Sequence, residues 1–165
     1  MKELVDILKH TKTHLMNGVS YMIPVVVGGG ILMAIAVLLT GEGAAPGWGS
    51  GIPYWLWTIG VDALGLMCPV FAAYIAFSIA DRPGIAVGMA GGFMALNIPT
   101  VFADGAVTTA SAGFIGAAIA GLLGGIIAHY LKKIPLPKSM QSLKSIIIIP
   151  VIGVLAVGII MFAFG

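Results

Sequence analysis

Charged residues are scarce in this chain of 165 residues, and their scarcity excludes a soluble globular domain. Only 8% of the residues are Asp, Glu, Lys or Arg, whereas 59% are hydrophobic. So few ionisable groups cannot provide the charged surface that a soluble domain of this length needs. The net charge of +2 comes with no dense basic patch, so nucleic acid is not an expected partner. The composition instead predicts an integral membrane protein.

Cysteine is nearly absent, and catalytic constellations are missing altogether. The single cysteine, Cys68, excludes an internal disulfide, and its apolar surroundings are typical of a buried structural thiol. His10 and His14 are spaced four residues apart, but two ligands without a third fall short of a metal site. No paired carboxylates, glycine-rich phosphate loop or nucleophile beside a base stand at a recognised spacing. We therefore expect no metal, no cofactor and no catalytic residue in this chain.

Long apolar runs dominate what is present. Five runs predict membrane-spanning helices, each near the roughly 20 residues that cross a bilayer core. They cover residues 20–40, 56–80, 85–101, 112–131 and 146–164. The third is about seventeen residues long and contains Pro99, so it is a full crossing, a tilted helix or a partly re-entrant element. Residues 2–16 alternate apolar and polar positions at helical spacing, which predicts a helix lying on the cytoplasmic surface. The predicted fold is all-α.

The basic residues fall only in alternate segments, namely before the first run, between the second and third, and between the fourth and fifth. The only charged residues in the other two connections are acidic, Glu42 in one and Asp104 in the other. Five crossings with a cytoplasmic N-terminus satisfy the positive-inside rule without exception. The aromatic residues near the first outer loop, such as Trp48, are typical of a membrane interface. The basic positions are Lys2, Lys9, Lys12, Arg82, Lys132, Lys133, Lys138 and Lys144.

Ionisable groups near membrane depth are the first candidates for function, because burying them in lipid is costly. Asp81 and Arg82 precede Pro83 and Gly84 in a predicted cytoplasmic turn. They are either an ion-paired gate or partner contact, or a turn that fixes topology. Asp62 is either a proton or cation site or, more simply, a residue near the outer headgroups, and His129 is most simply an interfacial residue. Loss of a hydrolytic activity on changing either residue would favour an intramembrane enzyme.

Uncharged polar residues suit a neutral solute such as a sugar, because they recognise hydroxyl groups without burying a charge. Asn17 and Asn97 are the candidate substrate-binding residues, with Ser20, Ser78 and Thr100 as further polar groups. Asn97 lies near Pro99, where freed backbone carbonyls would face a polar cavity. The alternative is that Asn97 bonds a neighbouring helix.

Glycines recur at a spacing of four residues, which lets helix backbones approach closely in a membrane. The pairs are Gly84 with Gly88, Gly88 with Gly92, and Gly121 with Gly125. Packing within one subunit is a simpler explanation of these pairs than dimerisation.

Three stretches together carry a family resemblance. They are HLMNGVSYMIPVVVGGGILMAIA, PVFAAYIAFSIADRPGIAVGMAGGF and AGFIGAAIAGLLGGIIAHYLKK, the last followed by a proline-containing loop and IIIIPVIG. They resemble membrane component IIC of the bacterial phosphoenolpyruvate-dependent sugar phosphotransferase system, most closely its fructose and mannitol branch. The resemblance implies a permease in the bacterial inner membrane that passes a sugar or polyol to a cytoplasmic IIB domain, whose phosphocysteine phosphorylates it.

The resemblance covers nearly the whole chain, yet components of that family are about twice as long. It implies that residues 1–165 are the scaffold and dimerisation half, and that a second half supplies the principal sugar-contacting motif. We therefore expect a sugar permease component with three partners, namely a IIB domain, a C-terminal IIC half and a second copy of the chain. The alternative is a membrane scaffold that does not transport and lacks the sugar site.

Overall fold

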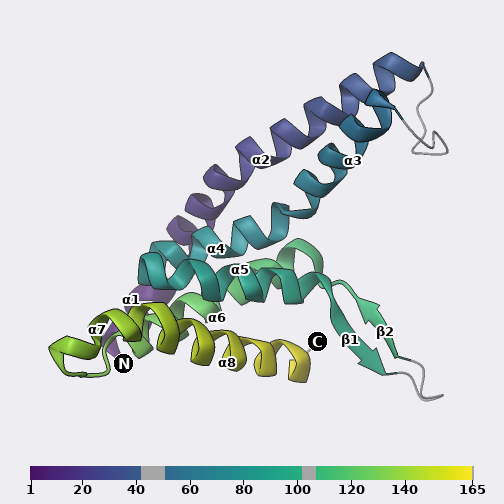
Figure 1. The fold of residues 1–165 in the computed structure, drawn as a ribbon. Helices are drawn as coiled ribbons and strands as arrows, with labels where there is room; N and C mark the ends of the chain where they lie inside the picture. Colours follow the sequence, from purple (N-terminus) through teal and green to yellow (C-terminus); the bar gives the residue numbers. More distant parts are fainter. Residues whose placement is uncertain (42–50, 102–106, 165) are drawn as a thin grey trace. The chain divides into compact units, whose positions relative to one another are not determined.

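The computed structural model describes residues 1–41, 51–101 and 107–164 (Figure 1). Helices make up nearly all of this described chain, so the predicted helical class is confirmed. The chain divides into two compact units, a division that the sequence did not predict. The first unit comprises Met1–Val19 and Cys68–Gly165, and the second comprises Ser20–Met67.

The predicted surface helix over residues 2–16 is wrong in extent, because the chain breaks at His10. Helix α1 covers Lys2–Lys9, and α2 covers Thr11–Thr40. His10 Nδ1 lies 2.8 Å from the carbonyl oxygen of Asp6, and the Thr11 hydroxyl donates to the carbonyl of Leu8 at 2.7 Å. These side chains occupy carbonyls at the end of α1, which favours a helix end there. Residues 11–19 therefore begin the long apolar helix.

The second unit is a pair of antiparallel helices, formed by residues 20–40 of α2 and by α3, which covers Ile52–Gly65 (Figure 1). The helices approach most closely at Gly29 and Gly60. A β-carbon added to Gly29 would lie 2.9 Å from the carbonyl oxygen of Gly60, and one added to Gly60 would lie 2.8 Å from that of Gly29. Both positions therefore require glycine for this close approach.

The second predicted crossing, residues 56–80, is interrupted in the structure. Helix α3 begins earlier, at Ile52, and a separate helix α4 covers Met67–Ala80, with Leu66 between them. Pro69 explains the interruption, because it has no N–H to donate to the carbonyl of Gly65. Pro53 stands in the first turn of α3, where a missing N–H costs nothing.

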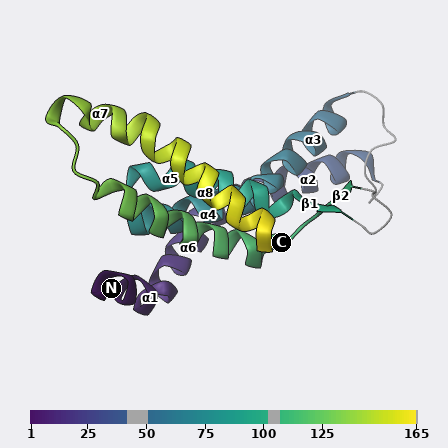
Figure 2. The same cartoon turned by 90° about the horizontal axis from the view of Figure 1, so that it is seen from below.

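The first unit is built around α4, α5, α6 and α8, which cover Met67–Ala80, Arg82–Leu96, Gly113–Lys132 and Ile149–Phe164 (Figures 1 and 2). The glycines predicted to allow close packing do so within this unit. A β-carbon on Gly92 would lie 2.7 Å from the carbonyl oxygen of Cys68, and one on Gly121 would lie 2.8 Å from that of Ala72. Packing within one chain is thus confirmed. The largest fully buried side chains are Phe71, Ile75, Ile149, Val87 and Val157.

The third predicted crossing, residues 85–101, is corrected in both extent and type. Helix α5 has 15 residues and ends at Leu96, and two short strands follow, β1 (Ile98–Val101) and β2 (Val107–Ala110). They pair antiparallel, with Ile98 opposite Ala110 and Val101 opposite Val107. Pro99 disfavours a helical conformation for the residue before it, which explains the end of α5. The all-α prediction thus omitted a small hairpin.

The basic connection is shorter than predicted, because helical structure resumes at Lys138 rather than at residue 146. A 3-10 turn (η1, Lys138–Met140), α7 (Gln141–Leu143) and a π-helical turn (η2, Lys144–Ile148) lead directly into α8. Pro137 immediately precedes this segment, and a proline is tolerated at a helix start although not in its interior. The fourth crossing, predicted at 112–131, agrees closely with α6.

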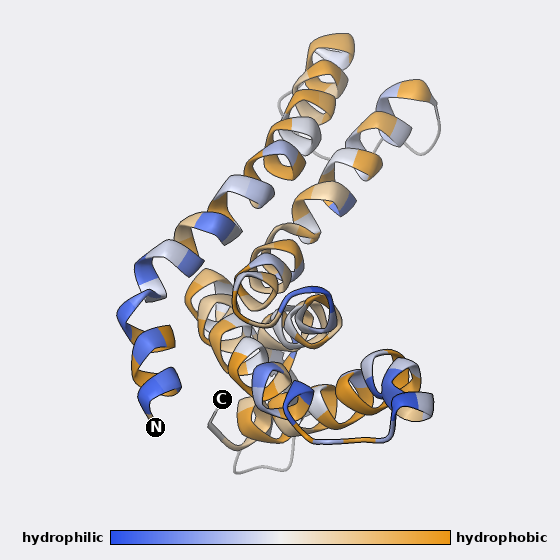
Figure 3. Ribbon diagram, turned by 90° about the vertical axis from the view of Figure 1, so that its left-hand side faces the viewer, coloured by the Kyte–Doolittle hydropathy of each residue, from blue (hydrophilic) through white to orange (hydrophobic). Residues whose placement is uncertain are grey.

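Four helical segments of the described chain are long and apolar enough to cross a membrane (Figure 3). Helix α5 is shorter than they are, so the predicted count of five crossings is not confirmed. The predicted outer loop around Glu42 and Trp48, and the acidic residue Asp104, lie outside the described residues. The four segments are Thr11–Thr40, Ile52–Ala80, Gly113–Lys132 and Lys138–Ala163.

Candidate functional site

Charged side chains from three helix ends meet at one end of the first unit, which we call the basic end. It contains the turn between α4 and α5, the end of α6, and the segment that leads into α7. Lys132, at the end of α6, donates a hydrogen bond from Nζ to Asp81 Oδ2 at 2.6 Å. Both side chains are largely exposed, so solvent screening limits this pair to about 0–1 kcal/mol. The pair therefore contributes little to stability, but it shows that the α4–α5 turn lies beside the end of α6.

Asp81 has an unusual backbone. It lies between α4 and α5 with φ of 61° and ψ of −151°, a region that is populated mainly by glycine. Its N–H bonds the carbonyl of Phe77 at 2.8 Å, and its carbonyl accepts from the N–H of Gly84 at 3.0 Å. The turn is therefore held by bonds on both sides. Arg82, the other predicted gate residue, begins α5 and is exposed.

Lys144 closes the end of α6. Its ammonium donates to the carbonyl oxygens of Lys132, the last residue of that helix, and of Ile134, which lies two residues beyond it. The last carbonyls of a helix lack hydrogen-bond donors within the helix and carry partial negative charge. An ammonium at this end donates hydrogen bonds to these carbonyls and also balances their charge. Lys144 thereby joins the segment that leads into α8 to the end of α6. No pattern in the sequence predicts this contact.

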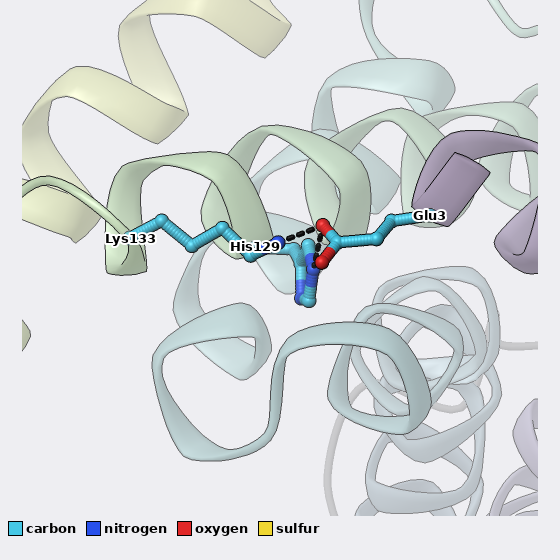
Figure 4. A network of polar contacts seen from close by, with 3 residues as sticks. All are labelled: Glu3, His129 and Lys133. Atoms are coloured by element: carbon cyan, nitrogen blue, oxygen red, sulfur yellow. Dashed lines mark ion pairs between the residues drawn. The ribbon is translucent and has the colours of Figure 1, made fainter. Parts of the chain in front are cut away.

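The N-terminal helix α1 is attached to α6 by ion pairs (Figure 4). The carboxylate of Glu3 pairs with the ammonium of Lys133 and lies 3.7 Å from Nε2 of His129. His129 and Lys133 are four residues apart, which places them on one face of α6. The predicted interfacial residue His129 thus has a specific acidic neighbour on α1.

Polar side chains near the start of α2 bond to α4. A hydrogen bond of 2.6 Å joins Nδ1 of His14 to Oγ of Ser78. The amide of Asn17 donates to the carbonyl oxygen of Tyr74 at 3.3 Å. Asn17 is half-buried by this contact. The partners are separated by 57 and 64 residues in the chain, so no local sequence pattern identifies them.

Asn97, the second predicted sugar contact, is exposed at the end of α5. Its side-chain amide donates to the carbonyl of Phe93 at 3.1 Å, so its described bond is to its own helix and not to a neighbouring one. Gly88 of α5 packs against Ala72 of α4, and Gly92 packs against Cys68, so the two helices are antiparallel. At 1.5 Å per residue, this register separates Asn97 from the level of Tyr74 by about 16 Å along the axes. Asn17 and Asn97 therefore do not form one site.

The remaining candidates have simple surroundings. Cys68 is buried, with 4% of its surface exposed, whereas Asp62 is exposed. Within residues 1–41, 51–101 and 107–164, no group of three or more His, Cys, Asp or Glu side chains is arranged to hold a metal ion.

Four long apolar helices, with charged residues gathered at helix ends, define an integral membrane protein. The family follows from comparison with known proteins. The family model described as "Phosphotransferase system, EIIC" matches residues 16–165. The chain belongs to this family, and the family predicted from the sequence is confirmed.

Several relatives are fructose-type components. "Fructose-like permease IIC component 2" of Escherichia coli is 47% identical over 168 residues, which cover 100% of this chain and 43% of the relative. "PTS system fructose-specific EIIABC component" of Bacillus subtilis is 42% identical, over 90% of this chain and 22% of that protein. "PTS system fructose-specific EIIC component" of Haloferax volcanii is 37% identical, over 87% and 41%.

The chain thus spans less than half the length of these relatives. No solved structure matches it.

Proposed function

We propose that this chain is part of a sugar permease of the phosphotransferase system that takes up a fructose-type sugar and couples uptake to phosphorylation. The observation that carries the proposal is the family match over residues 16–165, together with relatives whose names specify fructose. Residues 1–165 act as the scaffold half, and a further IIC segment supplies the rest of the path. The shorter length of the chain relative to its relatives supports this division.

The chain resides in the bacterial inner membrane and crosses it five times from a cytoplasmic N-terminus. Helix α5 is the fifth crossing, in addition to the four longer segments. Asp81 contacts Lys132 at one end of the α5 and α6 pair, while the carbonyl of Ala95 accepts from the N–H of Ala112 at the other, at 2.8 Å. Helix α5 therefore runs most of the length of α6. The basic end is the cytoplasmic end, as the positive-inside rule requires.

A IIB domain docks at the basic end and phosphorylates the sugar there. Relatives named EIIABC and EIIBC, from Bacillus subtilis and Escherichia coli, support a partnership between B and C components. Arg82 and Lys138 are exposed at this end and provide positive charge for an acidic partner surface. Asp81 and Arg82 act as the predicted gate or partner contact, because the α4–α5 turn stands at the cytoplasmic exit.

Asn17 and Asn97 contact the sugar at two separate points along the path. Amides recognise sugar hydroxyls without burying charge. Because these residues lie at different levels of the helices, a moving sugar meets them in turn.

A homodimer forms through surfaces other than the glycine pairs, which are occupied within the first unit.

A second candidate function is a scaffold that does not transport. One observation favours it: two pockets within the first unit, of about 630 and 350 Å³, are lined by apolar residues, as expected of packing defects between lipid-facing helices and not of a sugar site.

Uptake of labelled fructose tests both functions. Cells without their own fructose and mannitol permeases would express this chain alone, the remaining IIC segment of a relative with its IIB domain, or both. Sugar phosphate formed only when both are present supports the permease. Equal formation without this chain contradicts the proposal, and no formation with any combination favours the scaffold.

A further inference from the structure

A pocket of about 530 Å³ lies at the basic end, where α6 stops and the segment from Lys138 begins. Three lysines line it, together with polar groups from the first turns of that segment. Lys132, Lys144 and Ser145 contribute to its polar part, and Leu136 and Ile149 to its apolar part. A pocket lined by lysines on one side and by apolar side chains on another suits an amphipathic ligand.

The charge of the pocket is only partly balanced. Lys132 pairs with Asp81, and Lys133 pairs with Glu3. Among the described residues, the ammonium of Lys144 contacts two carbonyl oxygens and forms no ion pair with a carboxylate. These bonds hold Lys144 in position, and an ammonium has three N–H donors in total. A phosphate oxygen would complete its coordination by a charge-assisted hydrogen bond.

A second, apolar groove of about 630 Å³ lies along α8. Its lining includes Met94 of α5, and Pro150, Leu155 and Phe162 of α8. Helices α5 and α8 run parallel (Figure 2), because Gly153 packs on Val87 and Gly158 packs on Met94. Ile149 lines the basic pocket, and the next residue, Pro150, lines the groove. From Pro150 the groove runs along α8 away from the basic end.

The length of the groove matches an acyl chain. From Pro150 to Phe162 the helix rises about 18 Å at 1.5 Å per residue. One leaflet of a bilayer core is about 15 Å thick, half of the usual 30 Å. Leu155 and Ile159 line the groove and are about 60% exposed, so the groove opens toward the lipid phase.

We propose that the basic pocket and this groove bind one anionic phospholipid. The headgroup phosphate lies at Lys144 and Lys132, and one acyl chain lies along α8 between Pro150 and Phe162. Charge complementarity selects an anionic over a zwitterionic lipid, and the groove selects a lipid over free phosphate. Basic pockets between membrane helices on the cytoplasmic side suit such headgroups. The proposal does not depend on sugar transport.

Native mass spectrometry of the purified, delipidated chain measures this binding directly. The probes are dioleoyl-phosphatidylglycerol and dioleoyl-phosphatidylcholine. We expect the anionic lipid to bind at least fivefold more tightly than the zwitterionic one. Each lysine near an anionic headgroup contributes about 1 kcal/mol to binding, which is about a factor of five in affinity. Lys144→Gln should weaken this preference by about fivefold, because it removes one of the two lysines at the phosphate. Lys138→Gln is the matched control, because Lys138 is exposed near the pocket without lining it, and it should keep the preference.

Two further arms test the lipid against other anions. Inorganic phosphate should bind much more weakly than the lipid, and Leu155→Trp, which fills the groove from its exposed side, should weaken binding of dioleoyl but not dihexanoyl phosphatidylglycerol. An equal affinity for both lipid headgroups overturns the proposal. Displacement of the lipid by millimolar phosphate also overturns it, as does a Leu155→Trp variant with unchanged dependence on chain length.

Discussion

Gly88 of α5 lies so close to Ala72 of α4 that a β-carbon added to the glycine would stand 2.5 Å from the alanine carbonyl oxygen. The obstruction is backbone, which cannot move aside as a flexible side chain does. The close approach of α4 and α5 therefore depends on the absence of a side chain at this position. Gly84 and Gly92 meet α4 in the same way, one turn to either side.

Replacing Gly88 should consequently destabilise the first unit. Gly88→Ala should lower the free energy of unfolding by about 1–3 kcal/mol, the usual cost of overpacking. At this chain length the melting temperature should fall by roughly 5 °C. Thermal unfolding in detergent measures the change. Gly28→Ala is the control, because a β-carbon at Gly28 meets nothing within 4 Å, and it should leave the melting temperature unchanged or raise it. Equal effects of the two variants would contradict the packing described.

Backbone strain and charge at Asp81 are separable. Asp81→Asn loses the ion pair with Lys132 and keeps the strained φ of 61°, whereas Asp81→Gly loses the pair and relieves the strain. Such strain costs about 1–3 kcal/mol, more than an exposed ion pair contributes. Asp81→Gly should therefore unfold at a higher temperature than Asp81→Asn. Lys132→Gln breaks the same ion pair without changing Asp81, so it measures the effect of the charge alone. If Asp81→Gly melts at a lower temperature than Asp81→Asn, the backbone of Asp81 is not strained.

The attachment of α1 to α6 should depend on Glu3. Glu3→Gln removes the carboxylate that pairs with Lys133 and lies beside His129, so α1 should open more often. Hydrogen exchange of the α1 amides should accelerate by up to about fivefold, since an exposed pair is worth about 0–1 kcal/mol. High salt should produce a similar change in the unmodified chain by screening. Lys9→Gln, also on α1, is the control, and an unchanged exchange rate in Glu3→Gln would show that apolar contacts alone hold the helix.

The proposed sugar contacts predict a change in apparent affinity. Asn17→Ala and Asn97→Ala should each raise the KM for fructose uptake by about three- to tenfold, the effect of one lost hydrogen bond. Melting temperatures measured on the same variants separate binding from folding, because Asn17 also bonds Tyr74 and Asn97 also bonds Phe93. If only the melting temperature falls, these residues are structural.

The sequence predicted the helices better than their ends. The apolar runs located α2, α6 and α8, because lipid imposes length and hydropathy on any spanning helix. The breaks at His10 and Leu66 depend on local hydrogen bonds and on Pro69, which hydropathy does not register. The hairpin does have a sequence signal: β-branched residues lie on either side of a short connection, Ile98, Thr100 and Val101 before it and Val107 and Thr108 after it.

The polar contacts of the candidate site could not be predicted from the sequence. Glu3 and Lys133, or His14 and Ser78, lie far apart in the chain, and only tertiary packing makes them neighbours. The glycine spacing was informative because its physical basis is local to one helix face, although it does not say which helix packs against it. The sequence pattern indicates only that Lys144 contributes to membrane topology, whereas the structure shows its bonds to the end of α6.

A chimera tests whether this chain is a working part of a fructose-type permease. The segment of the Bacillus subtilis fructose-specific EIIABC component that matches this chain would be replaced by residues 1–165, and formation of labelled fructose phosphate would be measured in cells without other fructose permeases. We expect uptake by the chimera to be well above that of the deletion, and to be lost in a Gly88→Leu chimera. A chimera that is inserted and folded but forms no more sugar phosphate than the deletion would contradict it.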